Sequence, residues 1–230
     1  MKYKDVKEAT FLARPNRFVA QVMVDGVEET VHVKNTGRCE SLLEPGCKVM
    51  LEVSDNPKRK TKYDLISVYS ERLGWVNIDS LAPNELLKEW LASEANTLFP
   101  GPDYIKPECQ YGESRFDMYL EKDDRRIFME AKGCTLEWGW LGLFPDAPTE
   151  RGAKHLWELI EAVKEGYECY LVFVIQINGI THVRPNRPID PDFADAMRAA
   201  IVNGVKVLNL ECHIEPDSLE VVGYNIISNL

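Results

Sequence analysis

Three residues in the stretch SRFDMYLEKDDRRIFMEAKG, residues 114–133, have types and spacing that suit metal-assisted hydrolysis. Glu130 and Lys132 stand two residues apart, so they share one face of any strand that contains them. Asp117 lies on the strand-like run before them. Two neighbouring carboxylates repel each other, and both stay ionised when a divalent cation lies between them. The pattern therefore predicts a cation bound by Asp117 and Glu130.

The ligand types indicate which cation and which reaction would be involved. Hard oxygen ligands suit Mg²⁺ or Mn²⁺, and the carbonyl of Ala131 offers a third ligand. Lys132 could orient an attacking water and stabilise the negative charge of a phosphodiester transition state. The alternative is an ordinary ion pair between Glu130 and Lys132 on a solvated strand face.

A hairpin must bring the two acids together. If Asp123 and Asp124 form a two-residue turn, Asp117 lies directly across from Glu130, with their Cβ atoms about 5 Å apart. This register gives the hairpin one apolar face and one face that carries the charged residues. A register shift of one residue would place apolar and charged side chains on the same face. The apolar face contains Phe116, Met118, Leu120, Ile127, Met129 and Ala131. The other contains Asp117, Tyr119, Phe128, Glu130 and Lys132.

Further candidate groups follow in the segment GWLGLFPDAPTERGAKHLWELIEAVKEG. Arg151 and His155 are one helical turn apart at the rim of an apolar stripe, where they could contact a phosphate. An ordinary helix edge is the alternative. Three aromatic residues, Trp138, Trp140 and Phe144, occupy a predicted loop and could stack on bases. Packing over the sheet is expected for at least two of them.

Basic residues gather in three segments near the N-terminus: ARPNRF (13–18), KNTGRCE (34–40) and NPKRKTKYD (56–64). Such residues at loop tips can neutralise phosphates without reading a base sequence, although charge runs are also typical of solvated turns. A hairpin at Asp25-Gly26 would place Arg17 opposite Lys34 and join the first two segments. The predicted phosphate-binding residues here are Arg14, Arg17, Lys34, Asn35, Arg38, Lys58, Arg59, Lys60 and Lys62.

The elements that must position these residues divide the chain near residue 82. Residues 1–82 contain short strand-like runs between turn residues, which predicts a small β-barrel. Pro83 opens an apolar-striped helix at 83–98, and Glu85, Glu89 or Glu94 could add a carboxylate from it. Residues 83–230 then alternate, which predicts a mixed α/β domain. The expected strands are 104–111, 115–121, 126–132, 169–177 and 205–214, the helices are 152–165 and 191–203, and the last ten residues suggest an edge strand.

Charge and composition limit the function classes. The 230 residues carry a net charge of −10, but residues 1–82 hold 13 basic and 12 acidic residues against 14 and 25 in the remainder. Positive charge is thus concentrated at one end. Six cysteines form no CxxC pair, which predicts reduced thiols. No run approaches the about 20 apolar residues of a membrane span, and the N-terminus lacks the apolar core of a signal peptide. We therefore expect a cytoplasmic protein with no membrane partner.

In order along the chain, RPNRF, NTGR, PKRKTKYDL, SRFD, EAKGCTL and FPDAPTERGAKHL resemble the sugar fermentation stimulation protein A family. The resemblance implies an N-terminal OB-like barrel and a C-terminal mixed-sheet domain like the restriction-endonuclease or PD-(D/E)xK nucleases. It also implies non-specific DNA binding and a regulatory role in sugar, notably maltose, metabolism. By position, the nuclease-like motif falls on Asp117, Glu130 and Lys132. Ala131 stands where a β-branched residue is more usual, a change that a backbone carbonyl ligand would tolerate.

Three functions remain open from the sequence. The first is a DNA-binding protein with a metal-dependent nuclease site. The second is a non-enzymatic DNA-binding regulator that retains the nuclease scaffold. The third is a protein-interaction module without a nucleic-acid role. Nucleotide-binding loops and the G-x-S-x-G elbow of serine hydrolases are absent from the sequence.

Overall fold

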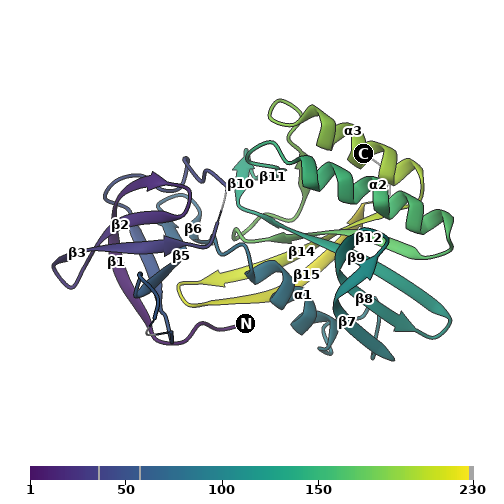
Figure 1. The fold of residues 1–230 in the computed structure, drawn as a ribbon, viewed down its shortest axis with the longest axis horizontal. Coiled ribbons are helices and arrows are strands. Elements are labelled where there is room, and N and C mark those ends of the chain that lie inside the picture. The colour runs from purple at the N-terminus through teal and green to yellow at the C-terminus, as the bar shows by residue number, and fades with distance from the viewer. Residues whose placement is uncertain (36, 57, 228–230) are drawn as a thin grey trace.

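A barrel and a mixed α/β domain lie side by side in the computed structural model, which describes residues 1–35, 37–56 and 58–227 (Figure 1). The barrel strands follow the order β3-β2-β1-β4-β5-β6. A short parallel pairing of β3 with β5 closes five of them into a ring, which is the expected OB-like architecture. These strands are β1 (Val6–Asn16), β2 (Val19–Val24), β3 (Val27–Val33), β4 (Lys48–Val53), β5 (Tyr63–Ser70) and β6 (Gly74–Asn77).

The first hairpin of the barrel has the predicted register. Asp25 and Gly26 both have positive φ, at 51° and 77°, as a two-residue turn requires. The β2–β3 ladder runs from Val24–Val27 to Val19–His32. Strand β1 contains many charged residues, but its alternation buries Ala9 and Phe11 in the barrel.

The second domain is a six-stranded sheet of order β15-β14-β12-β9-β8-β7 between helices. Strand β12 runs parallel to both β9 and β14, and the other neighbours are antiparallel. Helices α2 and α3 lie together on one face of the sheet (Figure 1). The elements are α1 (Ala82–Leu91), β7 (Tyr104–Tyr111), β8 (Ser114–Lys122), β9 (Arg125–Cys134), α2 (Glu150–Lys164), β12 (Glu168–Ile175), α3 (Pro191–Val202), β14 (Lys206–Glu215) and β15 (Ser218–Ile227).

Two segments differ from the expected elements. Helix α1 ends at Leu91 rather than at residue 98, because the Asn96 amide hydrogen-bonds the carbonyls of Leu91 and Phe99 and holds the chain in a loop. The loop expected around residue 140 contains a hairpin, β10 (Leu136–Trp138) and β11 (Leu141–Phe144). Strand β13 (Val183–Pro185) pairs with β11 to complete a small second sheet. The edge strand expected at the C-terminus is β15; residues 228–230 lie outside the described residues.

The β8–β9 hairpin has the predicted register but not every predicted face. Met118 pairs with Met129, and Lys122 pairs with Arg125 around the two-residue turn. Met118 and Met129 pack in the core beneath α1. Phe116 was expected on this face, but that expectation is wrong, because its ring packs against Phe128, with 5.1 Å between the ring centres, in the core beneath α2. The β8–β9 ladder ends at Met118–Met129, so the predicted cross-strand pair of Asp117 and Glu130 lies outside it.

Buried hydrogen bonds join the barrel to the second domain. The Gln176 amide donates to Asn77 Oδ1 at 2.6 Å and to the carbonyl of Asp79 at 3.0 Å. A backbone bridge joins Val76 to Ile177 beside them. Because Asn77 and Gln176 are almost fully buried, these bonds are costly to break. The two domains therefore meet at a defined junction. All six cysteines are free thiols, as expected.

Candidate functional site

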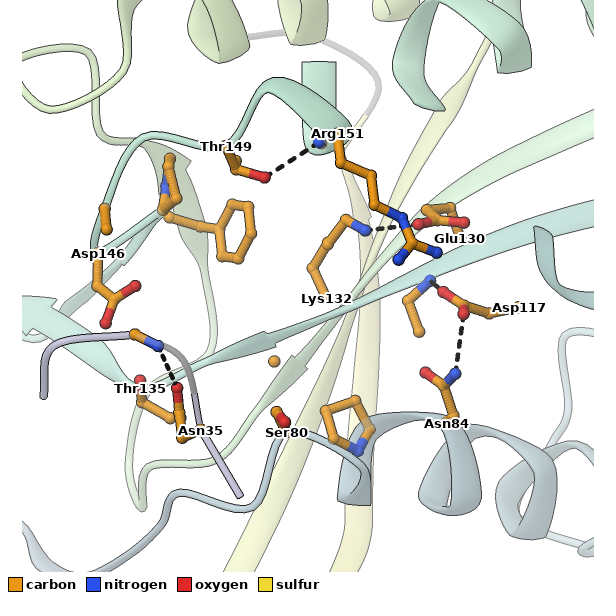
Figure 2. A pocket seen from close by; sticks show the side chains of 18 of the residues that line it. Asn35, Ser80, Asn84, Asp117, Glu130, Lys132, Thr135, Asp146, Thr149 and Arg151 are labelled. Carbon is orange, nitrogen blue, oxygen red and sulfur yellow. Dashed lines mark hydrogen bonds and ion pairs between the residues drawn. The ribbon is translucent and has the colours of Figure 1, made fainter. Parts of the chain in front are cut away.

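The predicted catalytic residues line a pocket of about 730 Å³ between the two domains. The barrel contributes Arg17, Asn35 and Gly37 to its wall. The second domain contributes the ends of β8 and β9, the first turn of α1 and the start of α2. Figure 2 shows Asp117, Glu130 and Asn84 on one side of this pocket and Asn35 and Asp146 on the other.

Glu130 is a buried carboxylate with one satisfied oxygen. Its Oε1 accepts from Lys132 Nζ at 2.5 Å and contacts Nδ1 of His155. Its Oε2 is buried without a hydrogen-bond partner among the described residues. Burial would raise the pKa of Glu130, but the charge of Lys132 and the hydrogen bond from His155 hold that pKa below its usual value. Glu130 is therefore held in its ionised form.

Asp117 of β8 lies close to Glu130 of β9 (Figure 2). Its Oδ2 accepts the backbone N–H of Ala131 at 2.8 Å, and its Oδ1 accepts from Asn84 Nδ2 at 2.8 Å. Burial and the neighbouring Glu130 charge raise the pKa of Asp117, although the charge of Lys132 opposes them. The two acids thus approach closely enough to repel each other, and two neutral donors orient the Asp117 carboxylate.

The two predicted residues of α2, Arg151 and His155, lie at different depths in the site. His155 is only 4% exposed and lies against Glu130 rather than at the rim. The Nε of Arg151 donates to His155 Nε2 at 3.4 Å, which makes Nδ1 the donor toward Glu130. Arg151 itself lines the pocket, and Figure 2 shows its guanidinium reaching over Glu130. Arg151 therefore faces the space in which a ligand would lie, whereas His155 supports Glu130 from below.

The carboxylates expected from the first helix do not take part. Glu89 pairs with the N-terminal amine at 2.7 Å, Glu85 lies 4.0 Å from Lys88, and Glu94 is exposed beyond the end of α1. Asn84 of the first turn reaches the site instead. Among the described residues, no group of three His, Cys, Asp or Glu side chains is arranged to hold a metal ion. A cation here would need backbone or water ligands besides the two acids.

Several barrel residues predicted to bind phosphate have protein partners. Arg14 donates to the backbone carbonyls of Arg17, Asn35, Gly37 and Arg38, at 2.6–2.9 Å, and so ties the segments 13–18 and 34–40 together. This confirms the expected proximity of those segments.

Asp64 engages two more of the predicted basic residues. Arg59 makes a bidentate pair with Asp64, and Lys34 lies 3.6 Å from the same carboxylate. Despite burial, these neighbours lower the pKa of Asp64. Lys58, Lys60 and Lys62 remain exposed, with Lys62 3.4 Å from Glu29. DNA contact by the basic residues of the barrel stays a prediction.

The aromatic residues beyond β9 are mostly at the surface. Trp138 is 80% exposed and Trp140 57% exposed, so the expectation that two of the three pack over the sheet is wrong. Only Phe144 packs inward, against Phe173 and Phe193. The guanidinium of Arg72, from the barrel, lies 5.6 Å from the ring centre of Trp140. The tryptophans are exposed because they belong to a short projecting hairpin.

Comparisons with known proteins agree with this architecture. A family model described as "SfsA N-terminal OB domain" matches residues 12–78, and one described as "Sugar fermentation stimulation protein RE domain" matches residues 81–218. The chain belongs to the SfsA family. The resemblance seen in the sequence motifs is confirmed, together with the OB-like barrel and the mixed-sheet domain of that family.

Relatives of the SfsA family match nearly the whole chain. A "Sugar fermentation stimulation protein homolog" of Ruminiclostridium cellulolyticum is 47% identical over 221 residues, which are 96% of each chain. One of Desulfitobacterium hafniense is 51% identical and covers 96% of this chain and 95% of its own. The solved structure titled "The structure of Pyrococcus Furiosus SfsA in complex with Ca2+" has a TM-score of 0.89 at 28% identity, over 97% of this chain and 96% of that one.

Across the part of the chain that the structure describes, no helix combines the length and the apolar character of a membrane span.

Proposed function

We propose that this protein binds DNA without sequence preference and cleaves phosphodiester bonds with Mg²⁺ or Mn²⁺ at Asp117 and Glu130. The observation that carries the proposal is the Oε2 of Glu130, which is buried beside a second carboxylate and has no hydrogen-bond partner within residues 1–35, 37–56 and 58–227. Leaving a buried acceptor unsatisfied costs about 1–3 kcal/mol. A divalent cation would satisfy that oxygen and offset the repulsion between the two acids.

The residues present fit such a cation. The N–H of Ala131 points toward Asp117, and within a strand the carbonyl of the same residue points to the same side. Two carboxylates and one carbonyl are the hard ligands that Mg²⁺ and Mn²⁺ prefer. The Pyrococcus furiosus relative is titled as a complex with Ca²⁺, and Ca²⁺ takes the same ligand types.

The charge of the pocket suits a phosphodiester once a cation is bound. Its lining contains four basic and four acidic side chains, so the protein alone is balanced there. A divalent cation would leave an excess of two positive charges, which attracts a phosphate. The basic residues are Arg17, Arg115, Lys132 and Arg151, and the acidic ones are Glu108, Asp117, Glu130 and Asp146.

Each residue of the site has a role in this proposal. A bound cation would supply Lewis acidity and lower the pKa of a water ligand. Lys132 faces the same space and would orient the attacking water and stabilise charge on the phosphate. Arg151 would bind the phosphate itself. Asn84 and His155 are positioning residues, since each holds one carboxylate in place.

Incubation of plasmid and single-stranded DNA with the pure protein, with Mn²⁺ and with EDTA, tests this function. We expect cleavage that depends on Mn²⁺ and falls by about 100-fold or more in Lys132→Ala, as is typical when a transition-state donor is removed. Asp117→Asn serves as a second inactive variant. Lys164→Ala is the matched control, because Lys164 is exposed at the far end of α2. Cleavage that survives both site variants would refute the assignment.

The same assay separates the enzyme from the alternative of a non-enzymatic regulator on a nuclease scaffold. Binding of DNA without cleavage under every condition would favour the regulator. The role in sugar metabolism that the family name implies, and the cytoplasmic location, stay predictions for this chain. The third function, an interaction module without nucleic acid, predicts no gel shift at low salt.

A further inference from the structure

A second, smaller cavity of about 230 Å³ opens on the barrel next to the catalytic pocket. The two cavities share Arg17 and Gly37 as wall residues, so they adjoin. Arg14 and Arg38 also line the smaller one, against a single acidic residue, Glu40. The guanidinium groups of Arg17 and Arg38 thus face a space that continues into the site of the proposed chemistry, whereas that of Arg14 is bound to backbone carbonyls. Such a pair of arginines suits the phosphates of a nucleic-acid backbone.

An aromatic ring is exposed beside these arginines. Phe18 is 49% exposed, and the guanidinium carbon of Arg17 lies 4.7 Å from the centre of its ring. Among the described residues, the Arg17 side chain has no hydrogen bond or ion pair. The side chain of Asn16 accepts the N–H groups of Phe18 at 2.8 Å and Val19 at 3.3 Å, which fixes the turn that presents the ring. An exposed ring with a guanidinium over it is a platform on which a base can stack.

The neighbouring catalytic pocket is enclosed on two sides by the two domains. Glu130 at its base is 2% exposed, and barrel and second domain both form its walls. The two domains touch across it, because a side chain at Gly37 would collide with the Asp146 carboxylate. A duplex is stiff over about 150 base pairs and keeps its base faces stacked. A single strand can bend into the pocket and expose its bases.

We propose that Phe18 and the cavity of Arg17 and Arg38 hold a single strand of DNA that continues into the catalytic pocket. Phe18 stacks on a base, and the arginines bind the phosphates next to it. This inference rests on the proposed DNA-binding function and specifies its substrate as single-stranded. It assigns to Phe18 a binding role that charge alone would not reveal.

Fluorescence anisotropy with labelled 12-nucleotide oligo(dT) and a 12-base-pair blunt duplex tests the inference. The full chain carries Asp117→Asn and EDTA is present, so that binding is measured without cleavage. We expect the single strand to bind at least tenfold more tightly than the duplex at equal salt. Phe18→Ala should weaken single-strand binding about five- to tenfold, the usual effect of losing one base-stacking contact.

The matched control is Val27→Ala, which removes another exposed apolar side chain, 58% exposed, from the barrel. This change should leave binding of both DNA forms unaltered. Equal or tighter binding of the duplex, binding of neither form, or unchanged binding by Phe18→Ala would overturn the inference. Tight single-strand binding by a protein that cleaves nothing would support this inference and refute the nuclease activity, so the two proposals can fail separately.

Discussion

Replacing Asp117 by asparagine should stabilise the metal-free protein while it removes the cation site. Burial and the Glu130 charge raise the pKa of Asp117, so folding disfavours its ionised form. Asparagine can retain both present contacts: its oxygen accepts the Ala131 N–H, and its amide donates to Asn84 once that amide turns over. The variant therefore removes a repulsion with little loss of hydrogen bonding.

The expected gain is small but measurable. Relieving two opposed like charges is worth up to about 1 kcal/mol, which raises the unfolding midpoint of a protein of this size by roughly 2–4 °C. Because the folded-state pKa of Asp117 is the raised one, its penalty is absent below the unfolded pKa and grows as the pH rises through the folded pKa. The advantage of Asp117→Asn should therefore be present at pH 7 and disappear as the pH falls toward about 4, the usual pKa of an aspartate.

Manganese should reverse the order of the two proteins. A ligand at 100 times its Kd stabilises the folded state by about 2.7 kcal/mol, or roughly 5–10 °C here. This gain should appear in the parent and be lost in Asp117→Asn. Differential scanning calorimetry in EDTA and in Mn²⁺, from pH 4 to 8, measures both effects. Asp55→Asn, a change at an exposed carboxylate, is the control.

Two results would refute this reasoning. One is a lower unfolding midpoint for Asp117→Asn than for the parent at pH 7 in EDTA, because the buried charge would then be stabilising. The other is an equal rise of the midpoint with Mn²⁺ in both proteins, because the cation would then bind elsewhere.

Two further predictions concern residues away from the catalytic pair. Arg14→Ala should destabilise the barrel by about 2–3 kcal/mol, since four backbone carbonyls lose a charged donor. Urea unfolding measures this loss, and Arg38→Ala, a change at an exposed arginine, should show no such loss. Equal losses in the two variants would contradict a structural role for Arg14. The hydrogen bond from Arg125, against the opposing effect of burial and with help from Lys206, lowers the pKa of Glu168 to about 2. Glu168→Gln should therefore lower the free energy of unfolding by about 1 kcal/mol at pH 7, a value reduced by partial exposure. This difference in stability between the two proteins should vanish as the pH falls toward 2, and a constant difference between pH 7 and 2 would exclude this linkage.

The sequence by itself determined the register of two hairpins, one in each domain. The side-chain period of two and the short turns at Asp25-Gly26 and Asp123-Asp124 determine which residues pair across each hairpin. Both registers are confirmed. These signals are reliable because every residue that sets them lies within one hairpin. The ordered motifs likewise identified the family and both of its domains.

Contacts between distant elements were decided only by the tertiary structure. Asn84 and Asp117 are 33 residues apart, and Glu130 and His155 are 25 apart. Their meeting depends on how α1 and α2 pack on the sheet, which no local pattern encodes. The sequence also offered the glutamates of the first helix as ligands, because only the packing of that helix on the sheet shows that they face away from the pocket.

The arginines show this limit most clearly. In the sequence, Arg14 and Arg17 are both basic residues of one short segment. In the fold, backbone carbonyls surround the Arg14 guanidinium, whereas Arg17 lies over an exposed ring between two cavities. The sequence shows which charged groups are present. Whether a charged group is free to bind a ligand depends on its desolvation and hydrogen bonding, and these arise only when distant segments pack around it.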